Sequence, residues 1–451
     1  MSHSSCFCAA IRSGWILALT LGFASVAVAS QWNEQVLYSF QSGTDGSFPV
    51  FGVVSDEAGN LYGATLEGGS TNCNSVYPCG TLYQLAQNNG VWAESVLYVF
   101  KGSAEGDGAS PFGGLAIDSS GNLYGTTAYG GTGSCVLLGE KVGCGTVFEL
   151  SPPAEKSGAW KEVVLYSFPT SRYGYLPWGQ LTFDSAGNLY GATQFGGGRG
   201  TTCNSYYQYC GEVFELSPPT KKGGKWEAKI LHSFGGGADG ANPNGGLFLD
   251  GNGVLYGTTV AGGYDCPHHS GQGCGTVFAL TPPTEKGGEW TEQQLHVFHN
   301  GNDGTSPVAG VTVDSRGFVY GGAQGGDNGQ GNGIIFRLAL SGGTWKQTIL
   351  HSFGSGVFYY GPAASYFDSQ GNLYGTTDAG QGFAGTVFRM RQSNGKWSYD
   401  ELYVFSGGSD GGNPSPILTT DSSGRIYGTT QNGGSGMACQ GACGTVFEIS
   451  P

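Results

Sequence analysis

Positively charged residues are scarce in this sequence. Its 19 lysines and arginines are outnumbered by 33 aspartates and glutamates, which gives a formal net charge of -14. Nucleic acids and anionic membrane surfaces attract proteins through basic side chains, so this balance excludes both as partners. Neutral and cationic ligands remain compatible with the chain.

Known catalytic motifs are missing as well. The sequence has no G-x-S-x-G nucleophile elbow, no H-E-x-x-H zinc motif, no phosphate-binding P-loop and no Rossmann glycine fingerprint ahead of a helix. A hydrolase or a cofactor-dependent enzyme would therefore need a constellation without a known motif. We predict a protein that is not an enzyme, with no catalytic residues and no cofactor.

Long hydrophobic runs are confined to the N-terminus. There, Arg12 precedes the apolar run Trp15–Val28, and small residues follow as far as Ala29. This order is typical of an export signal, so we expect residues 1–29 to be a cleaved signal peptide, with an uncleaved anchor as the alternative. No other run approaches the ~20 residues of a membrane span, so residues 30–451 are predicted to be one domain without membrane insertion, secreted or periplasmic.

The main feature that is present is one segment repeated seven times, in a chain with 85 glycines and 13% aromatic residues. Its commonest form is D-S-x-G-N-L-Y-G-T-T. The copies begin at Asp56, Asp118, Asp184, Asp250, Asp314, Asp368 and Asp421. Each copy is followed by a glycine-rich loop, typically Gly-Gly, and by a strand-like segment such as G-T-V-F-E-L. A strand opened by tryptophan also recurs, at Trp32, Trp92, Trp160, Trp226, Trp290, Trp345 and Trp397.

Each repeat contains four strand-like runs bounded by Gly, Asp, Asn and Pro. Four antiparallel strands repeated radially form the blade of a propeller, so we predict an all-β, seven-bladed β-propeller. The chain after the signal opens with the strand Trp32–Phe40 and ends after the third strand of the seventh copy, Gly444–Ile449. We expect the N-terminal strand to complete the last blade and close the ring, because both edges would otherwise be bare. An open array is the alternative.

The repeat resembles a known family. The pattern Y-S-F-x-x-x-x-D-G-x-x-P, then G-L-x-x-D-x-x-G-N-L-Y-G-T-T-x-x-G-G and G-T-V-F-E-L-x-P, is similar to the Gloeobacter/Verrucomicrobia tandem repeat of proteins named choice-of-anchor tandem repeat GloVer-containing. The resemblance covers essentially the whole chain after the signal. It implies an exported β-propeller, and the family has no established activity or catalytic residues to transfer.

Ten of the twelve cysteines follow the predicted signal as five pairs, each inside the Gly-Gly loop of one repeat. The pairs are Cys73 and Cys79, Cys135 and Cys144, Cys203 and Cys210, Cys266 and Cys274, and Cys439 and Cys443. The two repeats without cysteine have the shortest loops, so bridges occur where a long loop needs restraint. With an export signal, this spacing predicts five disulfides, each within one repeat. Zinc binding by the cysteines is the alternative, but the two thiolates of one loop fall short of the four ligands that zinc needs. His268 and His269 are the only histidines in such a loop, and we expect them to be exposed loop residues.

Strand order predicts which loops share a face. Loops of an antiparallel blade alternate ends, so the cysteine-bearing loops and the blade-to-blade loops emerge together at the surface, on what we call the stapled face. Five blade-to-blade loops contain Asp-Gly, at Asp45, Asp107, Asp239, Asp303 and Asp410. We interpret Asp-Gly as a turn device, with Asp accepting local hydrogen bonds and Gly supplying a positive φ. Calcium binding by these carboxylates together with nearby carbonyl groups is the alternative.

Two repeats depart from the Asp-Gly pattern and become aromatic. The third has S-R-Y-G-Y-L-P-W at Ser171–Trp178, and the sixth has G-V-F-Y-Y-G-P at Gly356–Pro362. Variable loops on a rigid scaffold usually carry binding, and aromatic rings suit sugars and peptides. The predicted ligand-binding residues, which include two tyrosines of the third cysteine-bearing loop, are Tyr173, Tyr175, Trp178, Tyr206, Tyr207, Phe358, Tyr359 and Tyr360. Rings that merely plug the face are an equal alternative.

These features predict an exported, monomeric β-propeller that acts as a ligand-binding or interaction scaffold for a carbohydrate or a protein. The alternatives are an extracytoplasmic propeller enzyme of the lyase or glycoside hydrolase type and a purely structural envelope protein. The D-x-x-G-N aspartates do not favour an enzyme. Seven equivalent carboxylates are typical of a turn, whereas glycoside hydrolysis needs one asymmetric pair of acids.

Overall fold

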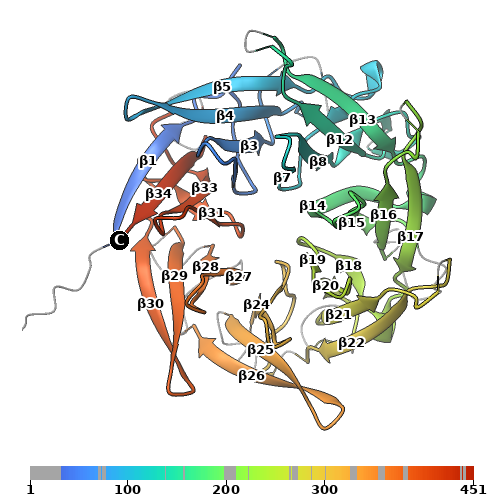
Figure 1. Cartoon of the computed structure of the whole chain (residues 1–451), viewed down its shortest axis with the longest axis vertical. Coiled ribbons are helices and arrows are strands. Elements are labelled where there is room, and N and C mark those ends of the chain that lie inside the picture. Colours follow the sequence, from blue (N-terminus) through green and yellow to red (C-terminus); the bar gives the residue numbers. More distant parts are fainter. Residues whose placement is uncertain are drawn as a thin grey trace, which may run out of the picture. The chain divides into compact units, whose positions relative to one another are not determined.

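The strands form seven antiparallel sheets arranged as the blades of a ring (Figure 1). The computed structural model describes residues 32–69, 73, 78–137, 139–155, 158–197, 210–221, 223–263, 266, 273–285, 287–299, 301–325, 333–353, 361–378, 384–436, 439 and 443–451. The predicted signal peptide lies outside these residues. The predicted all-β, seven-bladed propeller is confirmed.

Each blade runs from an inner strand, which is the shortest of its blade in most of the ring, to an outer strand of seven to nine residues. Blades 1 and 2 contain β2 (Val54–Ser55), β3 (Leu61–Thr65), β4 (Thr81–Asn88) and β5 (Val91–Val99), then β7 (Ala116–Ile117), β8 (Leu123–Thr127), β12 (Thr146–Ser151) and β13 (Lys161–Ser167). Blades 3 and 4 contain β14 (Tyr175–Phe183), β15 (Leu189–Phe195), β16 (Glu212–Ser217) and β17 (Glu227–Ser233), then β19 (Phe248–Leu249), β20 (Leu255–Ala261), β21 (Thr276–Thr281) and β22 (Thr291–Val297).

The remaining blades follow the same order. Blades 5 and 6 contain β23 (Thr312–Val313), β24 (Val319–Ala323), β25 (Ile334–Ser341) and β26 (Thr344–Ser352), then β27 (Ala363–Phe367), β28 (Leu373–Thr377), β29 (Thr386–Ser393) and β30 (Lys396–Val404). Blade 7 contains β32 (Thr419–Thr420), β33 (Ile426–Asn432), β34 (Thr445–Ser450) and β1 (Asn33–Ser39).

Short elements decorate the loops. They are β6 (Gly108–Ala109), β9 (Tyr129–Gly130), β10 (Val136–Leu137), β11 (Glu140–Lys141), β18 (Ala241–Pro243) and β31 (Gly412–Pro414), with the 3-10 turns η1 (Ser103–Glu105), η2 (Ser171–Tyr173) and η3 (Gly237–Asp239). No helix among the described residues is long and apolar enough to cross a membrane.

The N-terminal strand closes the ring. β1 pairs antiparallel with β34 from Asn33 opposite Ser450 to Ser39 opposite Thr445, and Figure 1 shows the two strands side by side. This pairing covers the edge that β34 would otherwise present, so it removes both bare edges at once. The predicted closure is confirmed.

Aspartates of the D-x-x-G-N segments hold the inner hairpins. Asp56 Oδ1 accepts the N–H groups of Ala58 and Asn60, both at 2.9 Å, and its Oδ2 accepts the Tyr62 hydroxyl at 2.9 Å. The aspartates of the other six blades accept the equivalent backbone and tyrosine donors. Gly59 takes a φ of 83°, which a type I hairpin of this length assigns to glycine. The turn interpretation of these aspartates is confirmed.

Aromatic pairs join every blade to the next. The phenylalanine that ends each outer strand contacts the ring on the third strand of the following blade, with centroids 5.0 to 6.1 Å apart. The pairs are Phe40/Tyr83, Phe100/Phe148, Phe168/Phe214, Phe234/Phe278, Phe298/Phe336, Phe353/Phe388 and Phe405/Phe447. Such edge-to-face pairs add to the energy of area burial. The Phe40/Tyr83 pair spans the closing junction, so the ring closes through the same contact that joins its other blades.

A glycine and a proline meet at each of these junctions. A Cβ atom added to Gly145 of blade 2 would lie 2.6 Å from Pro177 Cδ of blade 3. The other six junctions have the same arrangement, with 2.4 to 2.7 Å to the proline, at Gly80, Gly211, Gly275, Gly333, Gly385 and Gly444. All seven glycines have positive φ values, so both the backbone and the space require glycine.

Candidate functional site

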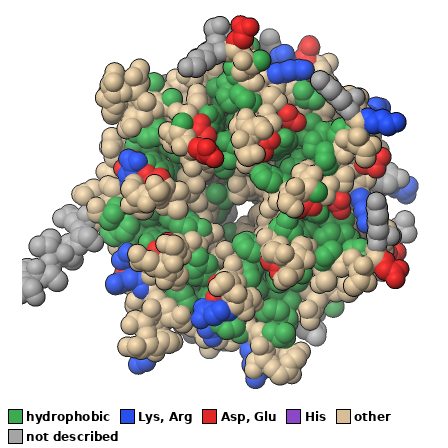
Figure 2. Space-filling model, in the orientation of Figure 1, with side chains coloured by type: hydrophobic (Ala, Val, Ile, Leu, Met, Phe, Trp, Pro, Cys, Tyr) green, Lys and Arg blue, Asp and Glu red, His purple; other side chains and the backbone are tan. Residues whose placement is uncertain are grey.

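The inner strands leave a cavity of about 390 Å³ at the centre of the ring. In six blades it is lined by the residue that follows the loop proline, namely Val50, Phe112, Trp178, Asn244, Val308 and Ala363. A second cavity of about 200 Å³ shares lining residues such as Phe51 and Pro416 with it, so both belong to one central channel. Figure 2 shows a face hollowed at its centre, with most Lys and Arg side chains towards the outer edge.

Trp178 is the largest side chain in the cavity wall. It lies on β14 and is half-buried. Its indole stacks on Phe112 of blade 2, with ring centroids 4.1 Å apart, and meets Phe51 of blade 1 edge-on at 6.4 Å. Neighbouring rings therefore support the indole, and a supported aromatic ring is well suited to receive a flat apolar ligand face.

Asp378 is the one charged side chain among the described residues that line this cavity. Burial raises the pKa of its carboxyl to about 6, against the opposing effect of a hydrogen bond from the Asn413 side chain. One carboxylate oxygen, Oδ1, is shielded from solvent and has no hydrogen-bond partner. Asn244, Thr376 and Gln431 add polar groups to the lining. The cavity thus combines aromatic walls with a few polar groups and one negative charge.

The other predicted aromatic residues lie elsewhere or outside the described residues. Tyr175 stacks on Phe195 at 5.5 Å and packs against the buried residues between blades 2 and 3, so it contributes to packing. Tyr173 lies in η2, where the structure describes the backbone only. The predicted residues outside the described part of the chain are Tyr206, Tyr207, Phe358, Tyr359 and Tyr360.

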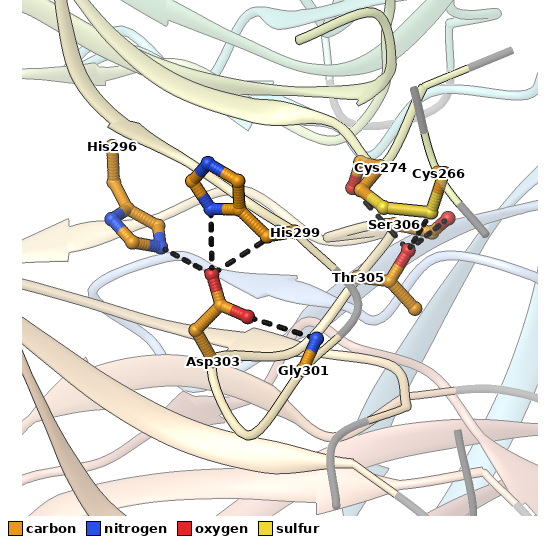
Figure 3. The surroundings of a disulfide bond; sticks show 8 residues. All are labelled: Cys266, Cys274, His296, His299, Gly301, Asp303, Thr305 and Ser306. Carbon is orange, nitrogen blue, oxygen red and sulfur yellow. Dashed lines mark hydrogen bonds and ion pairs between the residues drawn. A yellow bond between two sulfur atoms is a disulfide. The ribbon is translucent and has the colours of Figure 1, made fainter. Parts of the chain in front are cut away.

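The Asp-Gly aspartates accept hydrogen bonds from their own blade. Figure 3 shows Asp303 Oδ1 accepting the Gly301 N–H, while Oδ2 faces the histidines His296 and His299. Burial acts to raise the pKa of Asp303, but the nearby His296 and His299 side chains outweigh it and lower the pKa to about 2.

The four other Asp-Gly loops repeat this pattern. Their carboxylates accept a backbone N–H and a donor from the preceding outer strand, which is a tyrosine in blades 7, 1 and 6 and a histidine in blade 3; these aspartates are Asp45, Asp107, Asp410 and Asp239. Calcium requires oxygen ligands, whereas N–H and O–H donors surround these carboxylates, so the geometry favours the turn interpretation. No group of three or more potential metal ligands was found in the described part of the chain.

A second carboxyl group lies near four of these aspartates, on the outer strand of the next blade. Burial raises the pKa of Glu34, Glu94 and Glu162 to about 7, and the nearby aspartate adds to the shift. Burial and Asp239 raise the pKa of Glu292 in the same way. Each of these glutamates has a shielded Oε1 without a hydrogen-bond partner. The motif recurs at the periphery of the ring, away from the cavity lining.

The disulfides connect the stapled face to the cavity wall. Four bridges are described, each within one repeat as predicted; they join Cys73 to Cys79, Cys135 to Cys144, Cys266 to Cys274 and Cys439 to Cys443. The partner predicted for Cys210, Cys203, lies outside the described residues, as do His268 and His269. Disulfides form in oxidising compartments, which agrees with a location outside the cytoplasm.

The second cysteine of each described bridge is buried in the core. Its surface is 0% exposed at Cys79, Cys144, Cys274 and Cys443. Cys79 belongs to the buried cluster of Phe100, and Cys144 belongs to that of Phe168. The physical reason is that each of these cysteines directly precedes a junction glycine, where the next blade covers the chain. The bridges therefore anchor the loops to the core, and these four cysteines belong to the scaffold and not to a binding surface.

The second cysteine of a bridge also contacts the next blade. The Cys274 carbonyl accepts the Ser306 N–H at 2.6 Å, and the Cys443 carbonyl accepts the Phe48 N–H at 3.0 Å across the closing junction. Ser306 and Phe48 precede the loop proline and have positive φ values of 42° and 57°. The bridges therefore hold the strained backbone from which the cavity residues project.

Comparison with known families gives matches along almost the whole chain. The Gloeobacter/Verrucomicrobia repeat matches residues 27–266 and 266–451. The chain belongs to the Gloeobacter/Verrucomicrobia repeat family. A comparison with curated protein sequences gave no match.

The comparison of this Gloeobacter/Verrucomicrobia repeat protein with solved structures gives matches at low identity. A putative 6-phosphogluconolactonase from Bacteroides uniformis is 13% identical, with a TM-score of 0.47 over 78% of this chain and 85% of that chain. The GH93 α-L-arabinofuranosidase of Fusarium graminearum is 12% identical, with a TM-score of 0.42 over 92% and 97%. At these values the likeness concerns the fold alone.

Sequence reasoning missed Asp378 in this Gloeobacter/Verrucomicrobia repeat protein. The signal was available in the residue that follows each L-Y-G-T-T segment. The other six repeats have uncharged residues there, namely Leu66, Ala128, Gln194, Val260, Gln324 and Gln431. A position where one repeat alone carries a charge is not explained by the common fold.

Proposed function

We propose that this chain is an exported, non-enzymatic binding protein that holds a small carbohydrate in its central cavity. The observation that carries the proposal is the Trp178 indole, supported by Phe112 and lining a cavity of about 390 Å³. Ligand pockets of roughly 300–1,000 Å³ with apolar walls and a few polar groups are usual for small molecules. A volume near the lower limit favours a mono- or disaccharide over a protein segment.

The chemistry of the lining supports a sugar. One face of a pyranose ring presents C–H groups, which pack on an aromatic ring, while its hydroxyls need polar partners. Asn244 Oδ1 accepts the Gly245 N–H at 3.0 Å, and its amide NH₂ group can donate to a ligand. Gln431 and Asp378 supply further polar atoms. The sugar would therefore find both an apolar platform and hydrogen-bond partners.

Binding is favoured over hydrolysis because of the number of carboxyl groups. Glycoside hydrolysis ordinarily uses two carboxyl groups that flank the scissile bond. The described lining of the cavity offers one, Asp378, and the paired carboxyls of Glu94 and Asp45 lie at the periphery. Export is supported by the four disulfides and by the signal-like N-terminus.

A glycan array followed by isothermal titration calorimetry tests the proposal. We expect one class of small saccharide to bind the purified chain and the Trp178→Ala variant to bind it roughly 30-fold more weakly, because an aromatic anchor contributes about 2 kcal/mol. The matched control is Trp345→Ala, which removes an indole on the outer strand β26. Saccharide binding that is unchanged in Trp178→Ala, or no saccharide binding at all, would contradict the proposal.

A further inference from the structure

Asp378 is unusual for its position in the repeat. It directly follows β28, at the cavity end of the strand, where the other blades have leucine, alanine, valine or glutamine. Glutamine alone occurs there three times, at Gln194, Gln324 and Gln431. Because the same backbone accepts glutamine, the fold does not require a negative charge at this point.

The charge is also poorly compensated by the protein. The Asn413 side chain hydrogen-bonds the carboxylate, but Oδ1 has no partner and is shielded from water. No lysine, arginine or histidine is found among the described lining residues. Burying a carboxylate without a cation is costly, and a group that brings a positive charge to it gains correspondingly, since Coulomb attraction strengthens in an apolar cavity.

The cavity wall presents its aromatic rings away from this carboxylate. Trp178 and Phe112 belong to blades 3 and 2, whereas Asp378 belongs to blade 6, and Figure 1 places β14 and β28 on facing sides of the ring. Both groups line the same cavity, so a ligand that fills it would contact an aromatic surface at one end and a carboxylate at the other.

We infer that the ligand is an amino sugar with a free primary amine, whose ring stacks on Trp178 and whose ammonium group pairs with Asp378. This inference rests on the proposed function and names its ligand class. An ammonium group supplies three N–H donors and a positive charge, which suits the one carboxylate among the described lining residues. Anionic sugars are disfavoured, because the lining residues that the structure describes include no cation and the chain carries a net charge of -14.

The test compares three sugars that differ at one substituent: glucosamine, N-acetylglucosamine and glucose. Calorimetry with the wild-type chain should give the tightest binding for glucosamine. The variant Asp378→Gln, which installs the residue of three other blades, should weaken glucosamine binding by roughly 10- to 30-fold and glucose binding by a smaller factor. Added salt should weaken glucosamine binding more than glucose binding.

The outcomes separate this inference from the proposed function. Equal binding of glucosamine and glucose, or glucosamine binding that Asp378→Gln leaves unchanged, overturns the amine assignment while Trp178-dependent sugar binding still stands. Tighter binding of N-acetylglucosamine than of glucosamine overturns it as well. If none of the three sugars binds, the amine assignment fails, and the glycan array decides the proposed function separately. Melting temperatures of Asp378→Gln within about 2 °C of wild type confirm that the variant is folded.

Discussion

The junctions between blades and the wall of the central cavity use the same seven repeats in opposite ways. At the junctions the residues are nearly constant: a glycine meets a proline, and an aromatic pair joins each blade to the next. In the cavity wall, the residue after the same proline ranges from Ala363 to Trp178. Positions that every blade shares thus build the ring, and positions that differ between blades give the cavity its chemistry.

The largest loss of stability is expected when the closure of the ring is broken. Deleting residues 32–40 removes β1, exposes the edge of β34 and removes the Phe40/Tyr83 pair. We expect loss of the cooperative thermal transition, since both blades at the closing junction lose their partner. Circular dichroism melts measure this. A deletion variant that melts cooperatively near the wild-type temperature would show that the ring does not depend on closure.

A single junction glycine should have the next largest effect. Gly145→Ala adds a Cβ atom 2.6 Å from Pro177 Cδ at a φ of 97°, so overpacking and backbone strain together should lower the free energy of unfolding by about 3 kcal/mol. Gly139→Ala is the matched control, because Gly139 has a φ of 88° and no atom within 4 Å of the added Cβ. It should cost about 1 kcal/mol. Equal costs in urea unfolding would contradict the role of the junction.

Ring closure could be predicted from the sequence, whereas the functional site could be predicted only in part. Periodicity predicted the seven blades, the closing strand and the local disulfides, because each follows from the order of residues along one repeat. Trp178 was identified as a departure from that repeat. Tyr175 was also identified, but it packs on Phe195. Side chains alternate between the two faces of a strand, and the sequence does not say which of them meets the channel.

Burial of the second cysteines and the role of Asp378 were missed for a different reason. Cys79 and Cys144 are covered by the neighbouring blade, and the Asp378 side chain reaches the same cavity as Trp178 from a different blade. Both arrangements depend on the closed ring. Within its own repeat, Asp378 is a single polar residue that follows the L-Y-G-T-T segment and precedes a glycine-rich loop. Only the three-dimensional arrangement reveals that it is the one charge in the described lining of an aromatic cavity.

Removing a disulfide should lower the free energy of unfolding by less than replacing a junction glycine does. Replacing Cys266 and Cys274 by serine releases an eight-residue separation, for which loop entropy predicts a loss of roughly 2 kcal/mol. The Ser306 amide, which donates to the Cys274 carbonyl, should exchange its hydrogen faster. The Asn413 amide is the internal control, because it donates to the Ala384 carbonyl at 2.6 Å in a junction without cysteine. Equal acceleration at both amides would contradict a local effect of the bridge.

The smallest effect is a dependence of stability on pH. The pKa values of Glu34, Glu94 and Glu162 are raised by burial to about 7, so these groups keep their protons in the folded state at a pH where the unfolded chain has lost them. The stabilisation that these protonated glutamates contribute is therefore complete below the ordinary glutamate pKa, and it decreases as the pH rises towards 7. We expect a melting temperature a few degrees higher at pH 5 than at pH 8.

Glutamine variants supply the control for this pH dependence. Gln347 occupies the equivalent position in blade 5, so glutamate-to-glutamine changes are compatible with the repeat. The triple variant Glu34→Gln, Glu94→Gln, Glu162→Gln should show a flatter dependence between pH 5 and pH 8. A melting temperature of the wild-type chain that rises between pH 5 and pH 8 would contradict the raised pKa values of these glutamates.

The most direct test of the division between junction and cavity is a crystal structure of the chain soaked with the saccharide that binds most tightly. The account predicts ligand density in the central cavity, with the sugar ring against Trp178 and a polar substituent at Asp378. Density on the outer strands or on the D-x-x-G hairpins, with the central cavity filled by water alone, would contradict it.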